Sequence, residues 1–527
     1  MNSGPFNLAD YLLNHNLACA RRDKPAVLCG GARYTYAEVA SLACRAGNAL
    51  TGLGAGMEDR VLVVLPDGIE FVATWLGILK IGAVFAMANT VHTSDDYLYY
   101  LDYTRSPVAV VHESVLDRFE AILPKARHLK ALLVVGRAGG HASFDAETAR
   151  AGDRLETAPT EADDIAGWLF TSGSTGKPKA AVHFHRDFAY NIQTYAKQVL
   201  LMKEDDITVG VPKLFFGYAT GTNLMFPFAA GGTAALFPER STPEKVFEMI
   251  ETHRPTFLTT VPTMINAMLN IADQDRSLRR DLSCLRVCVS AGEALPGELY
   301  RRWKETFGVE ILDGIGSAEM FHIYISNRFG EVRPDSLGRV VPGYEAMVAG
   351  PDGNEVAPGE QGTLWVRGGS TALCYWQRRE SSRETFRGDW CVTGDQFVRD
   401  EEGYFYYRGR TDDMLKVSGI FVSPLEIEDC LLGHPAVREV AVVGHADEGG
   451  LTKPKAFIAL RDGHRPSREL ALQMRAFVKD RLSPYKYPRW IDFVEGLPRS
   501  DRGKVLRGEL RQGLPSLLSV PLSAGGE

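Results

Sequence analysis

The chain has 527 residues, which is too long for one hydrophobic core, so we expect at least two domains. Hydrophobic residues make up 45% and charged residues 24%, a composition that is typical of a globular protein and excludes extensive disorder. The formal net charge of -7 argues against a basic surface that binds nucleic acid.

The eight cysteines are scattered and include no C-x-x-C pair, which favours reduced thiols. Metal ligation is the alternative for Cys284 and Cys288, but both lie in an apolar segment that predicts a buried strand. The first ten residues lack a basic segment followed by an apolar run, and no run of about 20 apolar residues occurs. We therefore expect a soluble cytoplasmic protein that does not insert into a membrane.

From about Leu8 to Phe405, short β-branched runs alternate with segments of helical period. The runs Val61 to Leu65 and Val108 to His112 predict strands, and Gly68 to Ile81 predicts a helix. This alternation predicts an α/β fold, with a large N-terminal domain of mainly parallel β-sheets flanked by helices.

An aromatic strand, Tyr404 to Tyr407, precedes a polar and turn-prone run over residues 408–413, which predicts a domain boundary. We expect the domains to be 1–411 and 412–527, the second being a small α+β unit. Its expected elements are a helix beginning at Ser423, strands over Val437–Val443 and Ala456–Leu460, and a helix over Arg468–Lys479. We expect the polar tail after Leu514 to be frayed.

A polar loop over residues 171–179 follows the apolar strand Ile165 to Phe170. It offers backbone N–H groups, four hydroxyls and two cations together, which indicates binding of a polyphosphate. The loop is not a Walker A motif, because Thr171 stands where that motif needs glycine and Pro178 where it needs Ser or Thr. The alternative is a flexible surface turn rich in Ser and Gly.

Further blocks combine glycines with a carboxylate. Ser290 to Glu293 follows an apolar strand, a place where a glycine turn borders the ligand crevice of an open α/β sheet. Residues 313–319 follow the apolar strand Val309 to Leu312, and we expect a tight turn at their glycines with Asp313 before it and Glu319 after it. The alternatives are a turn-capping aspartate and a surface glutamate.

Taken in order, these blocks resemble the adenylate-forming superfamily over nearly the whole chain. That superfamily includes acyl-CoA and aryl-CoA synthetases, firefly luciferase and peptide-synthetase adenylation domains. The resemblance implies an enzyme that uses ATP and Mg²⁺ to adenylate a carboxylic acid with release of pyrophosphate, and then transfers the acyl group to CoA. The ATP- and AMP-binding residues that it implies are Thr171, Ser172, Gly173, Ser174, Thr175, Gly176, Lys177, Gly292, Glu293, Asp313, Gly314, Ile315, Ser317, Asp395 and Arg410.

Individual roles follow from the same resemblance. Glu319 corresponds to the carboxylate that helps to hold Mg²⁺ on the ATP phosphates. Asp313 corresponds to the residue that accepts a hydrogen bond from the adenine amino group. Asp395 corresponds to the ribose-binding aspartate, and Arg410 adds a charge-assisted contact to ribose or phosphate. Lys504 corresponds to the lysine that stabilises the charge crowded at the α-phosphorus during adenylation.

Two positions depart from the family pattern. Ile315 stands where many members carry an aromatic ring beside adenine, and Ala318 stands where threonine usually contacts the α-phosphate. Ser317 offers a hydroxyl next to Ala318, but from the adjacent position its side chain is expected to point elsewhere.

The second domain resembles the moving part of the family. Asp412 is the expected hinge between the arrangement for adenylation and the arrangement for thioester formation. Lys416 to Gly419 resembles the loop that lines the pantetheine channel, with Ser418 and Gly419 in the channel and Gly419 allowing close approach of the thiol. We include Lys416 with Lys504 and Glu319 among the expected catalytic residues.

Residues 213–221 and 320–323 resemble the benzoate-CoA ligase branch rather than fatty-acyl synthetases. Aromatic and apolar groups suit a flat ring, with a polar group at the end of the pocket. The alternative is that the aromatic groups belong to the core and that the histidine is a satisfied buried residue. The expected substrate-binding residues are Phe216, Gly217, Tyr218, Gly292, Ile315 and His322.

Members of the benzoate branch tend to carry alanine where Gly217 stands, so the pocket is expected to be one methyl wider beside the ring. We expect a substituted benzoate, with anthranilate as the leading candidate, and salicylate and benzoate remain open. A stand-alone aryl-adenylating enzyme that loads a carrier protein is the alternative function. A monomer or a homodimer is expected.

Overall fold

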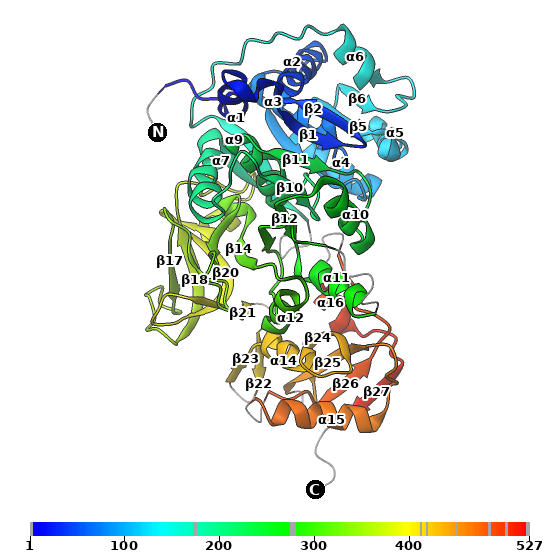
Figure 1. Cartoon of the computed structure of the whole chain (residues 1–527), viewed down its shortest axis with the longest axis vertical. Helices are drawn as coiled ribbons and strands as arrows, with labels where there is room; N and C mark the ends of the chain where they lie inside the picture. The colour runs from blue at the N-terminus through cyan, green and yellow to red at the C-terminus, as the bar shows by residue number, and fades with distance from the viewer. Residues whose placement is uncertain are drawn as a thin grey trace.

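A computed structural model describes residues 4–171, 177–274, 281–411, 414–417, 420–447, 451–482, 486–500 and 504–522. In Figure 1 the first part of the chain forms the upper body, a small sheet lies at its left, and the last part forms a separate lower body. The described residues include no helix that is long and apolar enough to cross a bilayer.

The first sheet places the strand ends that border the site. The six central strands of this sheet, β14, β13, β12, β10, β11 and β1, are parallel to one another. The strands outside them, β2 on one side and β15 and β16 on the other, pair in an antiparallel manner. Its order is β16 (Arg339–Val340), β15 (Ile323–Ser326), β14 (Ile311–Gly316), β13 (Val287–Ser290), β12 (Phe257–Thr260), β10 (Ile207–Gly210), β11 (Thr233–Leu236), β1 (Pro25–Cys29) and β2 (Ala32–Thr35).

The second sheet is parallel except for its pair β8 and β9, which carries the polar loop between its strands. Its order is β7 (Ala142–Ser143), β6 (Ala131–Val135), β5 (Val108–His112), β3 (Arg60–Val64), β4 (Val84–Met87), β8 (Ile165–Thr171) and β9 (Lys179–Phe184). A third, antiparallel sheet contains β17 (Glu345–Ala349), β18 (Gln361–Arg367), β20 (Trp390–Arg399), β19 (Phe386–Arg387) and β21 (Phe405–Arg410).

Helices pack on these sheets because burial of their apolar faces against the sheets removes apolar surface from water. In α3 every residue except Glu70 is buried, and α2 begins with a capping box in which Thr35 and Glu38 satisfy each other's backbone N–H groups. The helices of this part are α1 (Leu8–Leu17), α2 (Tyr36–Gly52), α3 (Ile69–Lys80), α4 (Ser94–Thr104), α5 (Leu116–Glu120), α6 (Phe144–Arg150), α7 (His185–Asn191), α8 (Gly217–Thr220), α9 (Phe226–Ala230), α10 (Pro243–His253), α11 (Pro262–Gln274), α12 (Gly297–Phe307) and α13 (Arg379–Thr385).

The last part of the chain has a hydrophobic core of its own, which runs from Leu415 to Leu522. Helices α14 and α15 cover its sheet, and α15 lies at the bottom of Figure 1. Its elements are β22 (Leu415–Val417), β23 (Ile420–Val422), α14 (Pro424–Leu432), β24 (Val437–Ala446), β25 (Thr452–Leu460), α15 (Arg468–Lys479), β26 (Trp490–Phe493), α16 (Arg507–Gln512) and β27 (Leu518–Pro521).

Two local expectations are wrong. The tail after Leu514 is not frayed throughout, because β27 pairs with β26 from Leu518 to Pro521. The glycines after Leu312 do not form a tight turn, because β14 continues through Gly316 and pairs with β15. A Cβ at Gly314 would lie 2.7 Å from the Ile325 carbonyl oxygen, so this glycine serves close approach of two strands.

Candidate active site

Glu319 lies in a short 3₁₀ turn, Ala318–Met320, directly after β14. Tyr375 donates its hydroxyl to Glu319 Oε1 at 2.5 Å, and burial together with the Glu319 charge raises the pKa of Tyr375. A tyrosine hydroxyl held against a carboxylate fixes the direction in which the second carboxylate oxygen points. The structure therefore presents Glu319 as an oriented carboxylate rather than as a surface charge.

Lys179 lies over the ring of the same tyrosine. Its Nζ is 3.7 Å from the centroid of the Tyr375 ring, and burial lowers its pKa although Glu319 favours the charged form. Lys179 begins β9 and Thr171 ends β8, so the two residues flank the polar loop and pair with each other. Lys177 is exposed with its Nζ 5.1 Å from the Tyr99 ring, and the rest of the expected phosphate-binding residues, 172–176, lie outside the described residues.

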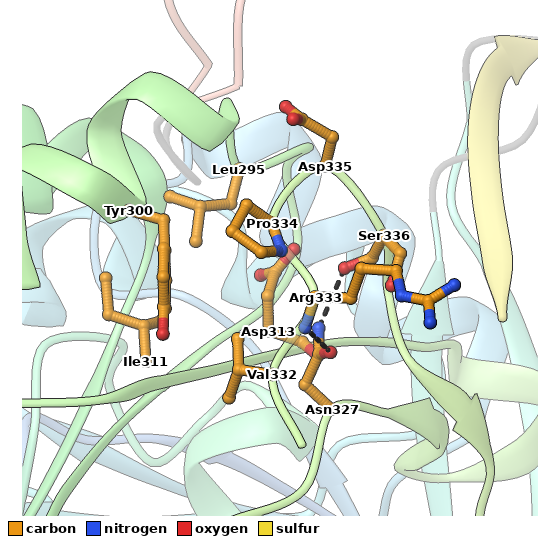
Figure 2. A pocket seen from close by; sticks show the side chains of 10 residues that line it. All are labelled: Leu295, Tyr300, Ile311, Asp313, Asn327, Val332, Arg333, Pro334, Asp335 and Ser336. Carbon is orange, nitrogen blue, oxygen red and sulfur yellow. Dashed lines mark hydrogen bonds between the residues drawn. The ribbon is translucent and has the colours of Figure 1, made fainter. Parts of the chain in front are cut away.

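Asp313 lies beside a small pocket, shown in Figure 2. The Asp313 side chain is 5% exposed, and its Oδ1 makes no hydrogen bond within the described part of the chain. Burial raises the pKa of Asp313 to about 8, so the carboxyl group is protonated at neutral pH in this structure. A buried acceptor without a partner matches a ligand that brings a hydrogen-bond donor. The pocket is lined by Leu295, Tyr300, Ile311, Asp313, Asn327, Val332, Arg333, Pro334, Asp335 and Ser336.

The raised pKa of Asp313 predicts a pH dependence of stability. Between its ordinary pKa of 3.8 and its folded pKa of about 8, the folded protein keeps a proton that the unfolded chain has lost. The contribution of Asp313 to the free energy of unfolding is therefore fully present below pH 4. It is lost as the pH rises to 8, and the free energy of unfolding then falls by up to about 1.4 kcal/mol per pH unit.

An Asp313→Asn variant is expected to show a smaller fall in melting temperature between pH 5.5 and pH 8 than the original chain. Thermal unfolding followed by fluorescence at several pH values measures this. Asp67 and Asp429, whose pKa values burial also raises, remain in both proteins, so the difference between the two curves isolates Asp313. Parallel curves would contradict the assignment.

Gly292 and Glu293 follow β13 at the crevice. Gly292 has a φ of +90°, and a Cβ built there would meet no atom within 4 Å, so open space lies beside it. Glu293 Oε2 accepts a hydrogen bond from the Thr263 hydroxyl at 2.8 Å, while its Oε1 is buried without a hydrogen bond among the described residues. Burial raises the pKa of Glu293, and the charges of Arg499 and Lys504 act in the opposite direction.

Asp395 and Arg410 face each other across the antiparallel pair β20 and β21. Arg410 NH1 lies 3.2 Å from Asp395 Oδ1. Burial raises the pKa of Asp395, whereas the charges of Arg410 and then Lys504 lower it. The charge of Lys504, in the last part of the chain, thus lowers the pKa of both Asp395 and Glu293 in the first part.

Ala318 follows Ser317, and its methyl side chain cannot form a hydrogen bond. The Ala318 carbonyl oxygen accepts a hydrogen bond at 2.7 Å from Nε2 of the buried His183, whose Nδ1 lies 3.0 Å from Asp187 Oδ2. The Ser317 hydroxyl is buried and has no partner among the described residues. Nothing in the structure explains alanine at position 318.

The expected aryl-binding segment begins at Phe216, where α8 starts. The Phe216 ring packs edge-on against Phe215 with centroids 4.5 Å apart. The Tyr218 hydroxyl donates to the Val289 carbonyl oxygen at 3.0 Å, which ties this segment to β13. A Cβ at Gly217 would lie 3.3 Å from Leu169 Cδ1, which is tighter than an ordinary contact, and 3.5 Å from the Phe321 carbonyl oxygen, so the space between these groups is slightly narrower than a methyl group.

His322 is buried and stays neutral, because burial lowers its pKa to about 4. Its Nε2 lies 3.0 Å from the Tyr218 carbonyl oxygen, which can only accept, so Nε2 carries the proton and Nδ1 is the acceptor. Nδ1 makes no hydrogen bond within the described residues. The preceding residue, Phe321, has φ 64° and ψ -52°, and His322 N donates to the Met320 carbonyl oxygen at 2.8 Å. This is a classic γ-turn, a strained conformation of the kind that clusters at functional sites.

The structure also tests whether Mg²⁺ fits here. No group of three or more His, Cys, Asp or Glu side chains gathers as a metal site in the described part of the chain. Mg²⁺ in nucleotide sites needs only one or two carboxylates, because phosphates and water supply the other ligands. The single oriented carboxylate of Glu319 fits such an ion. Ile315 is half-buried on β14.

Some expected residues fall outside this description. Asp412, Ser418 and Gly419 are not among the described residues, and only the backbone of Lys416 is described, in β22. Conversely, sequence reasoning missed four residues: Tyr375, Lys179 as a partner of Tyr375, Phe321 and Arg499. A positive φ at phenylalanine and a hydrogen bond between residues 56 positions apart leave no local sequence signal.

Comparisons with known proteins identify the family of the chain. The profile of the AMP-binding enzyme family matches residues 15–376, and that of the AMP-binding enzyme C-terminal domain matches residues 426–504. The benzoate–CoA ligase of Thauera aromatica is 46% identical over 508 residues, which cover 96% of each chain. The 4-hydroxybenzoate–CoA/benzoate–CoA ligase of Rhodopseudomonas palustris is 38% identical, over 96% of this chain and 94% of that one.

Two solved structures are similar throughout. The anthranilate CoA ligase AuaEII in complex with anthranoyl-AMP matches with a TM-score of 0.92 and 40% identity, over 96% of this chain and 97% of that chain. The benzoate CoA ligase from Burkholderia xenovorans LB400 matches with a TM-score of 0.89 and 41% identity, over 96% of this chain and 100% of that chain.

Proposed function

Because the chain belongs to the AMP-binding enzyme family and is an ATP-dependent aryl-CoA ligase, we propose that its acid is an ortho-substituted benzoate, with anthranilate as the leading candidate. The enzyme adenylates an aromatic carboxylate with release of pyrophosphate and transfers the acyl group to CoA with release of AMP. The observation that carries the choice of acid is the space at Gly217.

That space supports a ring with a small group next to its carboxylate. It is bounded by Leu169 and by the Phe321 carbonyl oxygen, which is a hydrogen-bond acceptor. An amino or hydroxyl group on the ring is a donor and can use such an acceptor, whereas a plain benzoate leaves the space empty. The two similar solved structures, of an anthranilate CoA ligase and a benzoate CoA ligase, are 40% and 41% identical to this chain, so these two identities do not decide between the acids.

His322 supports the same choice. Its Nδ1 is a buried acceptor with no partner in the described structure, and an unpaired buried acceptor costs about 1–3 kcal/mol. A ligand that brings an N–H or O–H group into reach of Nδ1 recovers part of this cost. Phe216, Tyr218, Gly292 and Ile315 then supply the flat, mostly apolar walls on which an aromatic ring packs.

For the adenylation step we assign a role to each of three carboxylates, one arginine and one lysine. Glu319 holds Mg²⁺, which when bound neutralises charge on the ATP phosphates. Asp395 accepts the ribose hydroxyls and Arg410 supports it. Asp313 accepts from the adenine amino group, and Lys504 stabilises the negative charge at the α-phosphorus. The loop from Thr171 to Lys177 covers the outer phosphates.

For the thioester step we propose that residues 412–527 form a mobile C-terminal domain that pivots at Asp412 against residues 1–411. Lys416, Ser418 and Gly419 would then line the passage for the CoA thiol. The separate hydrophobic core from Leu415 onward supports two bodies that can move independently. We also propose that the enzyme works in the cytoplasm, where ATP and CoA are available.

A panel of acids tests the proposed substrate. The panel contains anthranilate, salicylate, benzoate, 4-hydroxybenzoate and a medium-chain fatty acid, and the measurement is pyrophosphate release followed by thioester formation. We expect anthranilate to give the highest kcat/KM. Offering CoA and a phosphopantetheinyl carrier protein in separate reactions tests the alternative acceptor. Preference for benzoate or for the carrier protein would contradict the proposal.

A Gly217→Ala variant tests the space directly. The added methyl fills the gap beside Leu169, so the ratio of kcat/KM for anthranilate to kcat/KM for benzoate is expected to fall about tenfold or more. Gly52→Ala is the matched control, because a Cβ there meets no atom within 4 Å and the site is remote. An unchanged ratio in Gly217→Ala would exclude this glycine as the determinant.

A further inference from the structure

A chain of hydrogen bonds connects the small domain to the nucleotide side of the site. Arg499 NH1 donates to the Thr263 hydroxyl oxygen at 2.8 Å, and the same hydroxyl donates to Glu293 Oε2 at 2.8 Å. A second guanidinium nitrogen, NH2, lies 3.0 Å from Glu439 Oε2 on β24. Thr263 begins α11 of the large body, whereas Arg499 and Glu439 belong to the small one.

The Thr263 hydroxyl both donates and accepts in this arrangement. A hydroxyl has one proton to donate, and here that proton goes to Glu293 while a lone pair receives the guanidinium. Both bonds involve a charged partner, so each is stronger than a bond between neutral groups. Glu439 holds the other side of the guanidinium, which aims Arg499 at Thr263.

Arg499 and Lys504 share one folded segment. The Ser500 backbone N–H donates to the Lys504 carbonyl oxygen at 2.8 Å, the Lys504 N–H donates to the Ser500 hydroxyl at 3.2 Å, and Arg499 forms an antiparallel bridge with Val505. These bonds fix the backbone of Arg499 relative to that of Lys504. A contact that holds Arg499 against the large body therefore also sets the position of Lys504.

Among the described residues, two other polar contacts near α11 cross between the bodies, and both are longer. Asn266 Nδ2 lies 3.3 Å from the Arg438 carbonyl oxygen, and Arg461 NH1 lies 3.8 Å from Asp273 Oδ2. The contact through Thr263 differs from them because it reaches Glu293, at the crevice where Gly292 leaves open space.

We propose that Arg499 is a positioning residue, which through Thr263 and Glu293 holds Lys504 in the ATP site for adenylation. The inference rests on the proposed function, in which the small domain pivots between two steps. Arg499 lies in the small body and Thr263 lies in the large body. Their hydrogen bond therefore forms only when the small body packs against α11 as it does in this structure. The pair therefore serves the adenylation step and is separated when the small domain turns for thioester formation.

The experiment measures each half-reaction by itself in Arg499→Ala, Thr263→Val and the double variant. We expect pyrophosphate release to fall about ten- to a hundredfold in each single variant, the range for a lost charged hydrogen bond. Thioester formation from chemically prepared aroyl-adenylate and CoA is expected to stay within about twofold. The double variant is expected to lose no more than Arg499→Ala alone, because the two residues act as a unit.

Thr263→Ser is the matched control, since it keeps the hydroxyl and should keep the rate. Arg481→Ala, which removes a guanidinium that donates to the Phe477 carbonyl oxygen and lies over the Phe477 ring of its own domain, should change neither half-reaction. Melting temperatures confirm that each variant is folded. Equal losses in both half-reactions, additive losses in the double variant, or a loss in Thr263→Ser would overturn this inference alone. Failure of the original chain to release pyrophosphate with any aryl acid would overturn the proposed function together with it.

Discussion

A Lys504→Ala variant is expected to lose pyrophosphate release by about a hundredfold or more, while it still converts a supplied aroyl-adenylate and CoA into thioester. The reason is electrostatic. The reacting α-phosphorus is crowded by negative oxygens in the transition state, and a positioned ammonium is worth several kcal/mol there. Lys504 lies close enough to Asp395 and Glu293 to favour the ionised form of both carboxylates.

The two half-reactions of the Lys504→Ala variant are measured separately, by pyrophosphate release with ATP and acid and by thioester formation from synthetic adenylate. Lys304→Ala is a suitable control, because Lys304 lies on α12 and pairs with Glu310 at 3.6 Å on the surface. Its activity should match that of the original chain. Equal losses in both half-reactions of Lys504→Ala would contradict a role of Lys504 that is specific to adenylation.

A Glu319→Gln variant is expected to lower pyrophosphate release by about a hundredfold and to raise the Mg²⁺ concentration that gives half of the maximal rate. Glutamine keeps an oxygen that can accept from the Tyr375 hydroxyl, so the local geometry survives while the negative charge is lost. A neutral amide is a much weaker ligand for a hard cation than a carboxylate. A Mg²⁺ titration of the adenylation rate measures both effects.

Glu345→Gln is the control for this experiment, because Glu345 pairs with Arg367 at 2.6 Å on an exposed part of the third sheet. It should leave the Mg²⁺ dependence unchanged. If Glu319→Gln lowered the rate without altering the Mg²⁺ dependence, Glu319 would act on the reaction in another way than by holding the metal.

Much of the fold followed from local pattern. The strand Val108–His112 and the helix Arg468–Lys479 have the expected bounds, because a continuous apolar, β-branched run and a helical period are properties of short segments. The α/β fold with a small α+β domain and the aryl-CoA ligase activity are confirmed by the family profiles and by the similar ligases. The errors at Gly314, Gly316 and Leu518–Pro521 all concern strands whose partner lies elsewhere in the chain.

The expected site likewise has features that could be predicted from the sequence and features that could not. The resemblance of the sequence to the adenylate-forming superfamily pointed to Glu319, Asp395 and Lys504. It could not show that Tyr375 orients Glu319, nor that Asp395 and Arg410 pair across β20 and β21. The roles of these residues in catalysis remain predictions that the variants above test.

The sequence by itself therefore determined the class of reaction and the local elements, because both depend on residue types and short-range spacing. Only the tertiary structure decided how charges are placed and what restrains them. Arg499 and Thr263 are 236 residues apart, and their bond is set by packing of two bodies rather than by any local preference. The same holds for the space at Gly217, which exists because Leu169 and the strained turn at Phe321 stop short of it.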